Sequence, residues 1–75
     1  MQTNSLQTNM IIYVTLCIRE FAKKFDVPIP ECYNYLKDYG GLGFLIEHYD
    51  IEHTLSIDDA LDDMCAICAK NGGKL

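Results

Sequence analysis

The sequence lacks several features that mark familiar classes of protein. It has no tryptophan and two prolines, and no Lys or Arg lies between Lys37 and Lys70. No alternating apolar pattern indicates a β-strand, and no apolar run approaches the roughly 20 residues that a membrane-spanning helix needs. The polar, uncharged segment from Met1 to Asn9 differs from a secretory leader, which begins with a basic stretch. We therefore expect a chain without a membrane span that resides in the cytoplasm.

Negative charge predominates and is concentrated in the second half of the chain. The formal net charge is −5 at pH 7. Nucleic-acid binding needs a basic face for the phosphates, and the local basic cluster here is small, so we expect no nucleic acid as a partner. An acidic surface solvates the fold or attracts a basic protein. The residues expected on that surface are Asp38, Glu47, Asp50, Glu52, Asp58, Asp59, Asp62 and Asp63.

Size and cysteine content indicate one small domain with reduced thiols. The chain has 75 residues, of which 49% are apolar, enough for one compact core of marginal stability. The four cysteines, Cys17, Cys32, Cys65 and Cys68, would suggest disulfides in a secreted chain. In a cytoplasmic protein we expect them to be free and mostly buried.

Helical spacing of apolar residues recurs in four segments. It predicts helices over about residues 6–25, 29–39, 42–49 and 56–70, of which the third is short. We therefore expect an all-α fold, a bundle of four helices. The domain should cover residues 9–71, between a flexible polar tail at 1–8 and a C-terminal tail at 72–75.

Local signals predict where these helices begin and end. Pro28 and Pro30 suit the start of the second helix, Gly40 suits a left-handed cap at its end, and Ser56 suits an N-cap of the last helix. Gly40 and a turn over residues 50–56 are the expected corners. The expected buried positions include Ile11, Ile29, Tyr33 and Ile46.

The densest group of candidate functional residues surrounds the third predicted helix. It consists of Tyr39, Gly40, Tyr49, Asp50, His53 and Thr54. Asp50 with His53 resembles a general acid–base pair, but such a pair needs a pocket that shifts its pKa values. The alternative is that these residues satisfy backbone groups at the turn.

Two further groups have alternative interpretations. Cys65 and Cys68 have zinc-pair spacing, and His48 with His53 would complete a four-ligand set. Both cysteines also continue an apolar stripe, which favours buried thiols, so we expect no metal and no cofactor. Tyr13 and Tyr35 lie off the main stripes of their helices and are candidates for an interface with a partner.

The order of these elements resembles a known family. The first helix ends in Glu20-Phe21-Ala22-Lys23-Lys24, a Tyr39-Gly40 stop follows, and then comes Tyr49-Asp50-x-x-His53-Thr54. This combination, over about residues 11–69, is similar to a family of short bacterial proteins catalogued as domain of unknown function three-seven-nine-one. The resemblance implies a helical fold and no assigned reaction. It also implies genes near ADP-ribosyltransferase-like toxins, and hence an accessory or antitoxin-like role.

The sequence thus predicts a non-enzymatic interaction module that binds a protein partner or a second copy of itself as a homodimer. The alternative is a small metal-binding or catalytic protein that uses His48, His53, Cys65 and Cys68, or Asp50 with His53.

Overall fold

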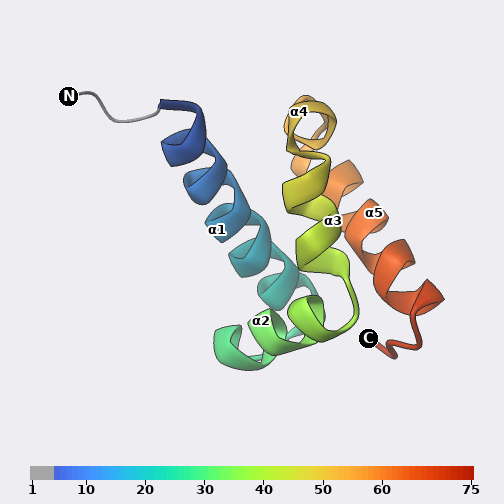
Figure 1. The fold of residues 1–75 in the computed structure, drawn as a ribbon. Coiled ribbons are helices and arrows are strands. Elements are labelled where there is room, and N and C mark those ends of the chain that lie inside the picture. The colour runs from blue at the N-terminus through green and yellow to red at the C-terminus, as the bar shows by residue number, and fades with distance from the viewer. Residues whose placement is uncertain (1–4) are drawn as a thin grey trace.

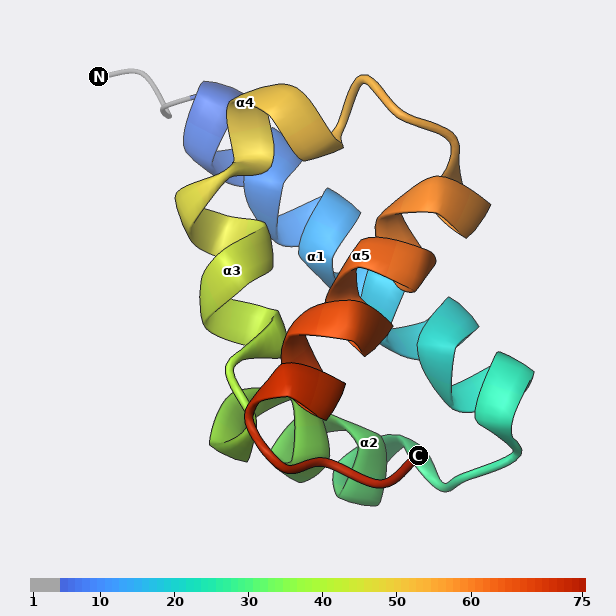
Figure 2. The same ribbon diagram turned by 90° about the vertical axis from the view of Figure 1, so that its right-hand side faces the viewer.

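A computed structural model describes residues 5–75, and within them the fold is entirely helical (Figure 1). The helices are α1 (Ser5–Phe25), α2 (Ile29–Asp38), α3 (Gly41–Glu47), α4 (Tyr49–Glu52) and α5 (Ile57–Lys70). α1, α3 and α5 pack against one another, α2 closes one end of this group, and α4 lies at the other end beside the start of α1 (Figure 2). The all-α prediction is confirmed for this part of the chain.

The first corner follows from backbone geometry at Asp26 and from the two prolines after it. Asp26 has a φ of 54°, a left-handed conformation that Asp tolerates better than most residues. The amide of Val27 then donates to Ala22 O at 3.0 Å and closes the end of α1. Pro28 is the N-cap of α2, and Pro30 lies in its first turn, where its missing amide hydrogen is not needed.

Gly40 and Gly41 form the second corner. Gly40 has a φ of 87°, which confirms the predicted left-handed cap. The side-chain amide of Asn71 donates to Tyr39 O at 2.8 Å and ties the end of α5 to this corner. Gly41 is buried where α3 meets α5. The corner therefore depends on glycine twice, once for its conformation and once for its small size.

The number of helices differs from the prediction. The third predicted helix ends at Glu47, because His48 has a φ of −108° and a ψ of 26°, outside helical geometry. A separate one-turn helix, α4, follows where a turn was expected. Tyr49 and Glu52, three residues apart, are both buried, so packing holds this turn in helical form. The prediction of four helices was wrong in number, because the described residues form a fifth helix, the short α4.

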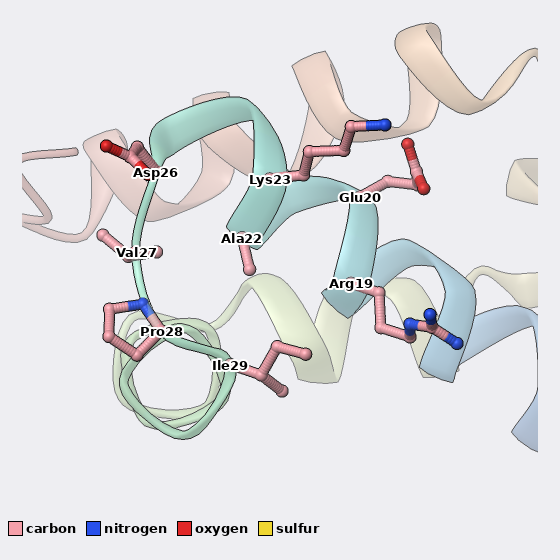
Figure 3. A pocket seen from close by; sticks show the side chains of 8 residues that line it. All are labelled: Arg19, Glu20, Ala22, Lys23, Asp26, Val27, Pro28 and Ile29. Carbon is pink, nitrogen blue, oxygen red and sulfur yellow. The ribbon is translucent and has the colours of Figure 1, made fainter.

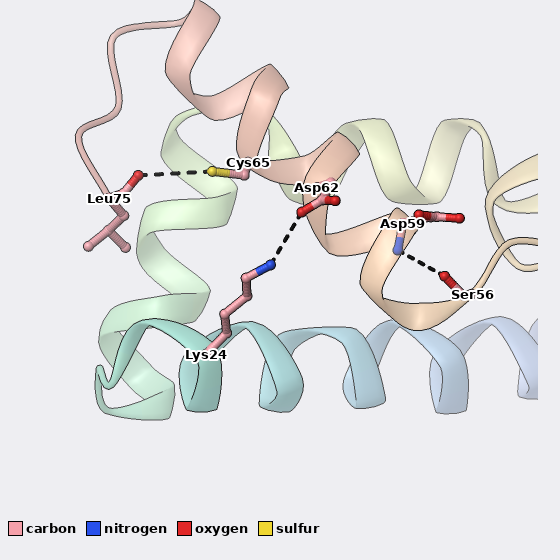
Figure 4. A network of polar contacts seen from close by, with 6 residues as sticks. All are labelled: Lys24, Ser56, Asp59, Asp62, Cys65 and Leu75. Carbon is pink, nitrogen blue, oxygen red and sulfur yellow. Dashed lines mark hydrogen bonds and ion pairs between the residues drawn. The ribbon is translucent and has the colours of Figure 1, made fainter.

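Both predicted tails contain ordered residues. Residues 1–4 of the predicted N-terminal tail lie outside the described part of the chain, whereas residues 5–8 belong to α1, because each further residue adds one hydrogen bond to a formed helix. At the other end the amide of Leu75 donates to the Tyr35 hydroxyl at 3.2 Å. The Sγ of Cys65 lies 4.0 Å from Leu75 O (Figure 4). The C-terminal segment thus folds back onto α2 and α5.

α5 begins as its sequence predicts and is tied to α1. The Ser56 side chain accepts a hydrogen bond from the Asp59 amide at 3.1 Å, which confirms the predicted N-cap (Figure 4). Lys24 Nζ lies 3.2 Å from Asp62 Oδ1 and joins α1 to α5. This ion pair is exposed, so we expect it to contribute at most about 1 kcal/mol.

The core draws side chains from the four longer helices. Its largest fully buried side chains are Cys17, Phe21, Cys32, Leu36, Leu45, Met64 and Cys68. Three of the four thiols are therefore buried, and all four are free, as predicted. Burial raises the pKa of Cys17, Cys32 and Cys68, so these thiols stay protonated and act as small apolar side chains.

Candidate functional site

One side of α1 carries exposed apolar side chains that none of the other described helices covers. Ile11 and Ile12 are 61% and 63% exposed, and Leu16 lies one turn further along the same side. We call these three residues the outer face of α1. Single exposed apolar residues are ordinary, so it is their grouping on one side of α1 that makes the outer face a candidate surface.

A shallow apolar groove lies beside the outer face, between α1, α2 and α3. It encloses about 320 Å³, and Ile11 belongs to both surfaces. The residues that line it are Met10, Ile11, Val14, Thr15, Ile18, Tyr33, Leu42 and Ile46. The outer face and the groove together form one apolar surface.

This surface contains residues that the sequence pattern predicted to be buried. Ile11, Tyr33 and Ile46 are exposed, and so is Ile29 at the start of α2. The correction has a simple cause: α2 and α3 are much shorter than α1 and cannot cover an apolar stripe along its whole length.

The groove continues toward α4. A second hollow, of about 340 Å³, shares Met10 and Ile46 with the groove. Its remaining walls are Glu47, Tyr49, Asp50 and His53. The α4 end of the groove is therefore acidic and contains three of the residues that the sequence singled out.

Three aromatic rings form a compact corner at this end, where α1 meets α4. The rings of Tyr49 and His53 stack with centroids 4.5 Å apart and an interplanar angle of 13°. Tyr13 meets Tyr49 edge-on at 5.5 Å, and its hydroxyl donates to Glu52 O at 2.9 Å. We call Tyr13, Tyr49 and His53 the aromatic corner; it anchors α4 to α1.

Asp50 and His53 are not joined by a hydrogen bond or an ion pair within the described residues. His53 Nδ1 lies 2.6 Å from Tyr49 O, and since a carbonyl oxygen only accepts, Nδ1 carries the hydrogen. The Thr54 hydroxyl likewise donates to Ile51 O at 2.6 Å. Among the hydrogen bonds and ion pairs of residues 5–75, none joins Asp50 to His53. Both residues line the second hollow, but His53 is engaged with its own backbone.

Replacing His53 by alanine should lower the free energy of unfolding by about 1 kcal/mol, because one hydrogen bond and one ring stack are lost. Chemical denaturation of the purified variant measures this change. His48→Ala is the matched control, since His48 is the other histidine and caps the same helix at its start. An equal loss of stability in both variants would contradict the anchoring role of His53.

Glu52 is the residue of this region that sequence reasoning placed wrongly. It was expected on the acidic surface, but it is 4% exposed and faces Asp63 of α5. Burial, with the neighbouring Asp63 carboxyl, raises the pKa of Glu52 to about 7, against a weaker opposite effect of His48. The spacing of Tyr49 and Glu52, one helical turn apart, was the available signal for a buried position.

The predicted metal alternative is not assembled. Within residues 5–75 no three His, Cys, Asp or Glu side chains gather where they could hold a metal ion. Cys68 packs beside Gly41, and Cys65 lies next to the C-terminal segment. His48 and His53 flank α4 instead. The set of His48, His53, Cys65 and Cys68 is therefore wrong as a ligand group for this part of the chain.

The two tyrosines proposed as interface residues make contacts within the chain. Tyr13 belongs to the aromatic corner, and Tyr35 lies between Phe21 and Tyr39, with centroids 6.3 and 5.0 Å away. Both are half-buried. Contact of either residue with a partner stays a prediction.

A further hollow lies at the α1–α2 corner and has a different character. Its lining mixes charges of both signs, with Arg19, Glu20 and Lys23 on α1 and Asp26 in the loop before α2 (Figure 3). In the view of Figure 3 the Arg19 and Lys23 side chains extend away from the loop. Four of its eight lining residues are charged and Ile29 is its exposed large apolar side chain, so it is the weaker candidate for protein binding.

None of the helices in residues 5–75 combines the length and apolarity needed to cross a bilayer. A family model described as "Protein of unknown function (DUF3791)" matches residues 12–71. This match confirms the resemblance predicted from the sequence. No curated protein and no solved structure matches the chain.

Proposed function

The chain belongs to the DUF3791 family of proteins of unknown function, and we propose that it is a non-enzymatic module that binds another protein. The observation that carries this proposal is the apolar surface made by the outer face of α1 and the groove beside it. Burying it would add the apolar contacts that so small a core cannot make internally.

The occupant that suits this surface is the apolar side of a short helix of the partner. Grooves between helices accept amphipathic helices through side chains spaced three and four residues apart. Glu47 and Asp50 stand at the α4 end of the groove, and Arg19 stands beyond the outer face at the other. A partner helix with basic residues toward α4 would complement these charges.

The biological setting we propose follows the family resemblance. An acidic module of 75 residues suits an accessory or antitoxin-like role beside a toxin-type protein in the bacterial cytoplasm. Such a role needs binding and no chemistry. The hydrogen bond between His53 Nδ1 and Tyr49 O gives this histidine a role in the fold, and this supports the non-enzymatic assignment.

A second copy of the chain is the other candidate for the partner. If two α1 helices paired antiparallel through their outer faces, Arg19 of each copy would approach the α4 end of the other, where Glu47 and Asp50 lie. In a two-fold dimer this favourable contact occurs twice. Light scattering of the purified chain distinguishes this homodimer from a monomer that awaits another protein.

The decisive experiment is affinity capture of the tagged chain from its native cells, followed by reconstitution with the purified partner. Ile12→Asp should weaken binding at least tenfold, because it places a charge in the apolar contact; a tenfold loss corresponds to about 1.4 kcal/mol. Isothermal titration calorimetry measures the change.

Ala66→Asp provides the matched control, since Ala66 is also exposed but lies on α5. It should leave binding unchanged, and both variants should retain the helical circular dichroism of the wild type. Equal binding by wild type and Ile12→Asp would show that the apolar surface is not the interface. If the wild-type chain captures no protein and stays monomeric, the proposed function as a protein-binding module is overturned.

A further inference from the structure

Among the described residues, Glu52 is the one buried carboxyl side chain with an oxygen that lacks a hydrogen-bond partner. Its Oε1 has no hydrogen-bond partner within this part of the chain, and neither ion pair found there involves Glu52. Its backbone carbonyl is fixed by the Tyr13 hydroxyl, so the side chain cannot leave without moving α4. A buried carboxylate without a counter-charge is costly, whereas a buried neutral carboxyl is tolerated.

The groups that surround Glu52 do not supply the missing positive charge. Asp63 faces it from α5, and Tyr13 and Cys17 face it from α1. His48, at the start of α4, is the only nearby group among the described residues that favours the ionised form. His48 is half exposed and already lies 3.9 Å from Glu47, so its effect is small beside burial and Asp63.

We propose that Glu52 is a proton-binding residue that links pH to the docking of α4: the neutral carboxyl stays buried beside Asp63, and its ionisation loosens α4 from α1 and α5. A pKa of about 7 for Glu52, from burial first and Asp63 second, places this change near neutral pH. α4 also carries Tyr49, which walls the acidic end of the groove. Proton release would therefore reshape that end, whether or not the groove binds a protein.

The direction of the pH effect follows from the two pKa values. The folded value, about 7, lies above the value of 4.5 for an unburied Glu. The folded state therefore binds the proton more tightly, so its contribution to stability is complete below about pH 4.5 and is lost as the pH rises toward 7. Above that pH, Glu52 is ionised in both states and the loss is constant.

Thermal unfolding of wild type and Glu52→Gln from pH 5 to pH 8, at fixed ionic strength, tests the proposal. Gln keeps the shape and cannot ionise. The difference in Tm, variant minus wild type, should increase as the pH rises. At pH 8 this difference should be at least about 5 °C larger than at pH 5. Asp50→Asn, an exposed position of the same helix, should follow the wild type. Equal pH dependence of wild type and Glu52→Gln would overturn the proposal.

Two measurements on the wild type keep the test independent of the variant's folding. Carbon NMR of the Glu52 carboxyl should titrate near pH 7, and a midpoint near 4.5 would contradict a buried proton. Amide hydrogen exchange, corrected for its intrinsic pH dependence, should lose protection in α4 between pH 6 and pH 8 while α5 retains it. Unchanged protection in α4 would overturn the coupling to docking.

Discussion

Replacing Gly41 by valine is expected to lower the free energy of unfolding by about 3 kcal/mol. A Cβ at this position would lie 2.8 Å from Cys68 Sγ and 3.0 Å from Leu36 Cδ2. Cys68 and Leu36 are fully buried, so neither can move aside without disturbing the core. α3 would have to shift away from α5, and for a domain of this size such a loss lowers the Tm by well over 10 °C.

Gly43→Val is the matched control for this prediction. Gly43 lies on the same helix, but a Cβ there meets nothing within 4 Å. Valine is a slightly better helix former than glycine, so the free energy of unfolding should stay within about 0.5 kcal/mol of wild type. Urea denaturation of the two variants measures the difference. Similar losses at both positions would mean that the close contact of residue 41 with α5 does not decide the effect.

The sequence was most informative where a local rule fixes the backbone. Proline at the start of α2, glycine with a positive φ at residue 40 and the Ser56 cap of α5 each act through their own residue and its neighbours. These signals do not depend on what packs nearby. The ends of three long helices could therefore be predicted within one or two residues.

Burial was harder to predict because it depends on the length of the neighbouring helices. Apolar spacing identifies the side of a helix that can be buried, but the neighbouring described helices cover Ile29 and Ile46 only in part. Glu52 shows the reverse case, since a residue assigned to the acidic surface became buried through the packing of α4. Both depend on contacts between segments far apart in sequence.

The candidate site was predictable only in part, for the same reason. The Tyr49 to Thr54 segment was singled out from its residue types, and the structure places His53 and Thr54 in local backbone hydrogen bonds. The outer face of α1 was missed, because Ile11 was counted with the buried side and Ile12 and Leu16 were assigned to no surface. A second apolar side on a helix 21 residues long was the signal that could have revealed it.

Phe21→Ala is expected to lower the free energy of unfolding by about 4 kcal/mol, because it removes a ring from the centre of the core and leaves a cavity. Phe21 is fully buried and packs against Phe25, with ring centroids 4.7 Å apart. A domain of this size has a total stability of only about 4–11 kcal/mol, so the variant should be close to unfolding at 37 °C. Thermal and urea denaturation measure the loss, and the milder Phe21→Leu gives a folded reference.

Ile12→Ala makes the same kind of truncation on the opposite side of α1. Phe21 lies nine positions after Ile12. At 100° per residue, nine steps place the two side chains about 180° apart around the helix. Ile12 is exposed, so its truncation leaves no cavity and should change the free energy of unfolding by less than about 0.5 kcal/mol. A large loss at Ile12 would mean that the outer face is already covered, as in a tight homodimer, and its dependence on protein concentration would identify that case. A small loss would mean that α1 holds the fold together with one apolar side and that the other side adds little to the stability of the single chain.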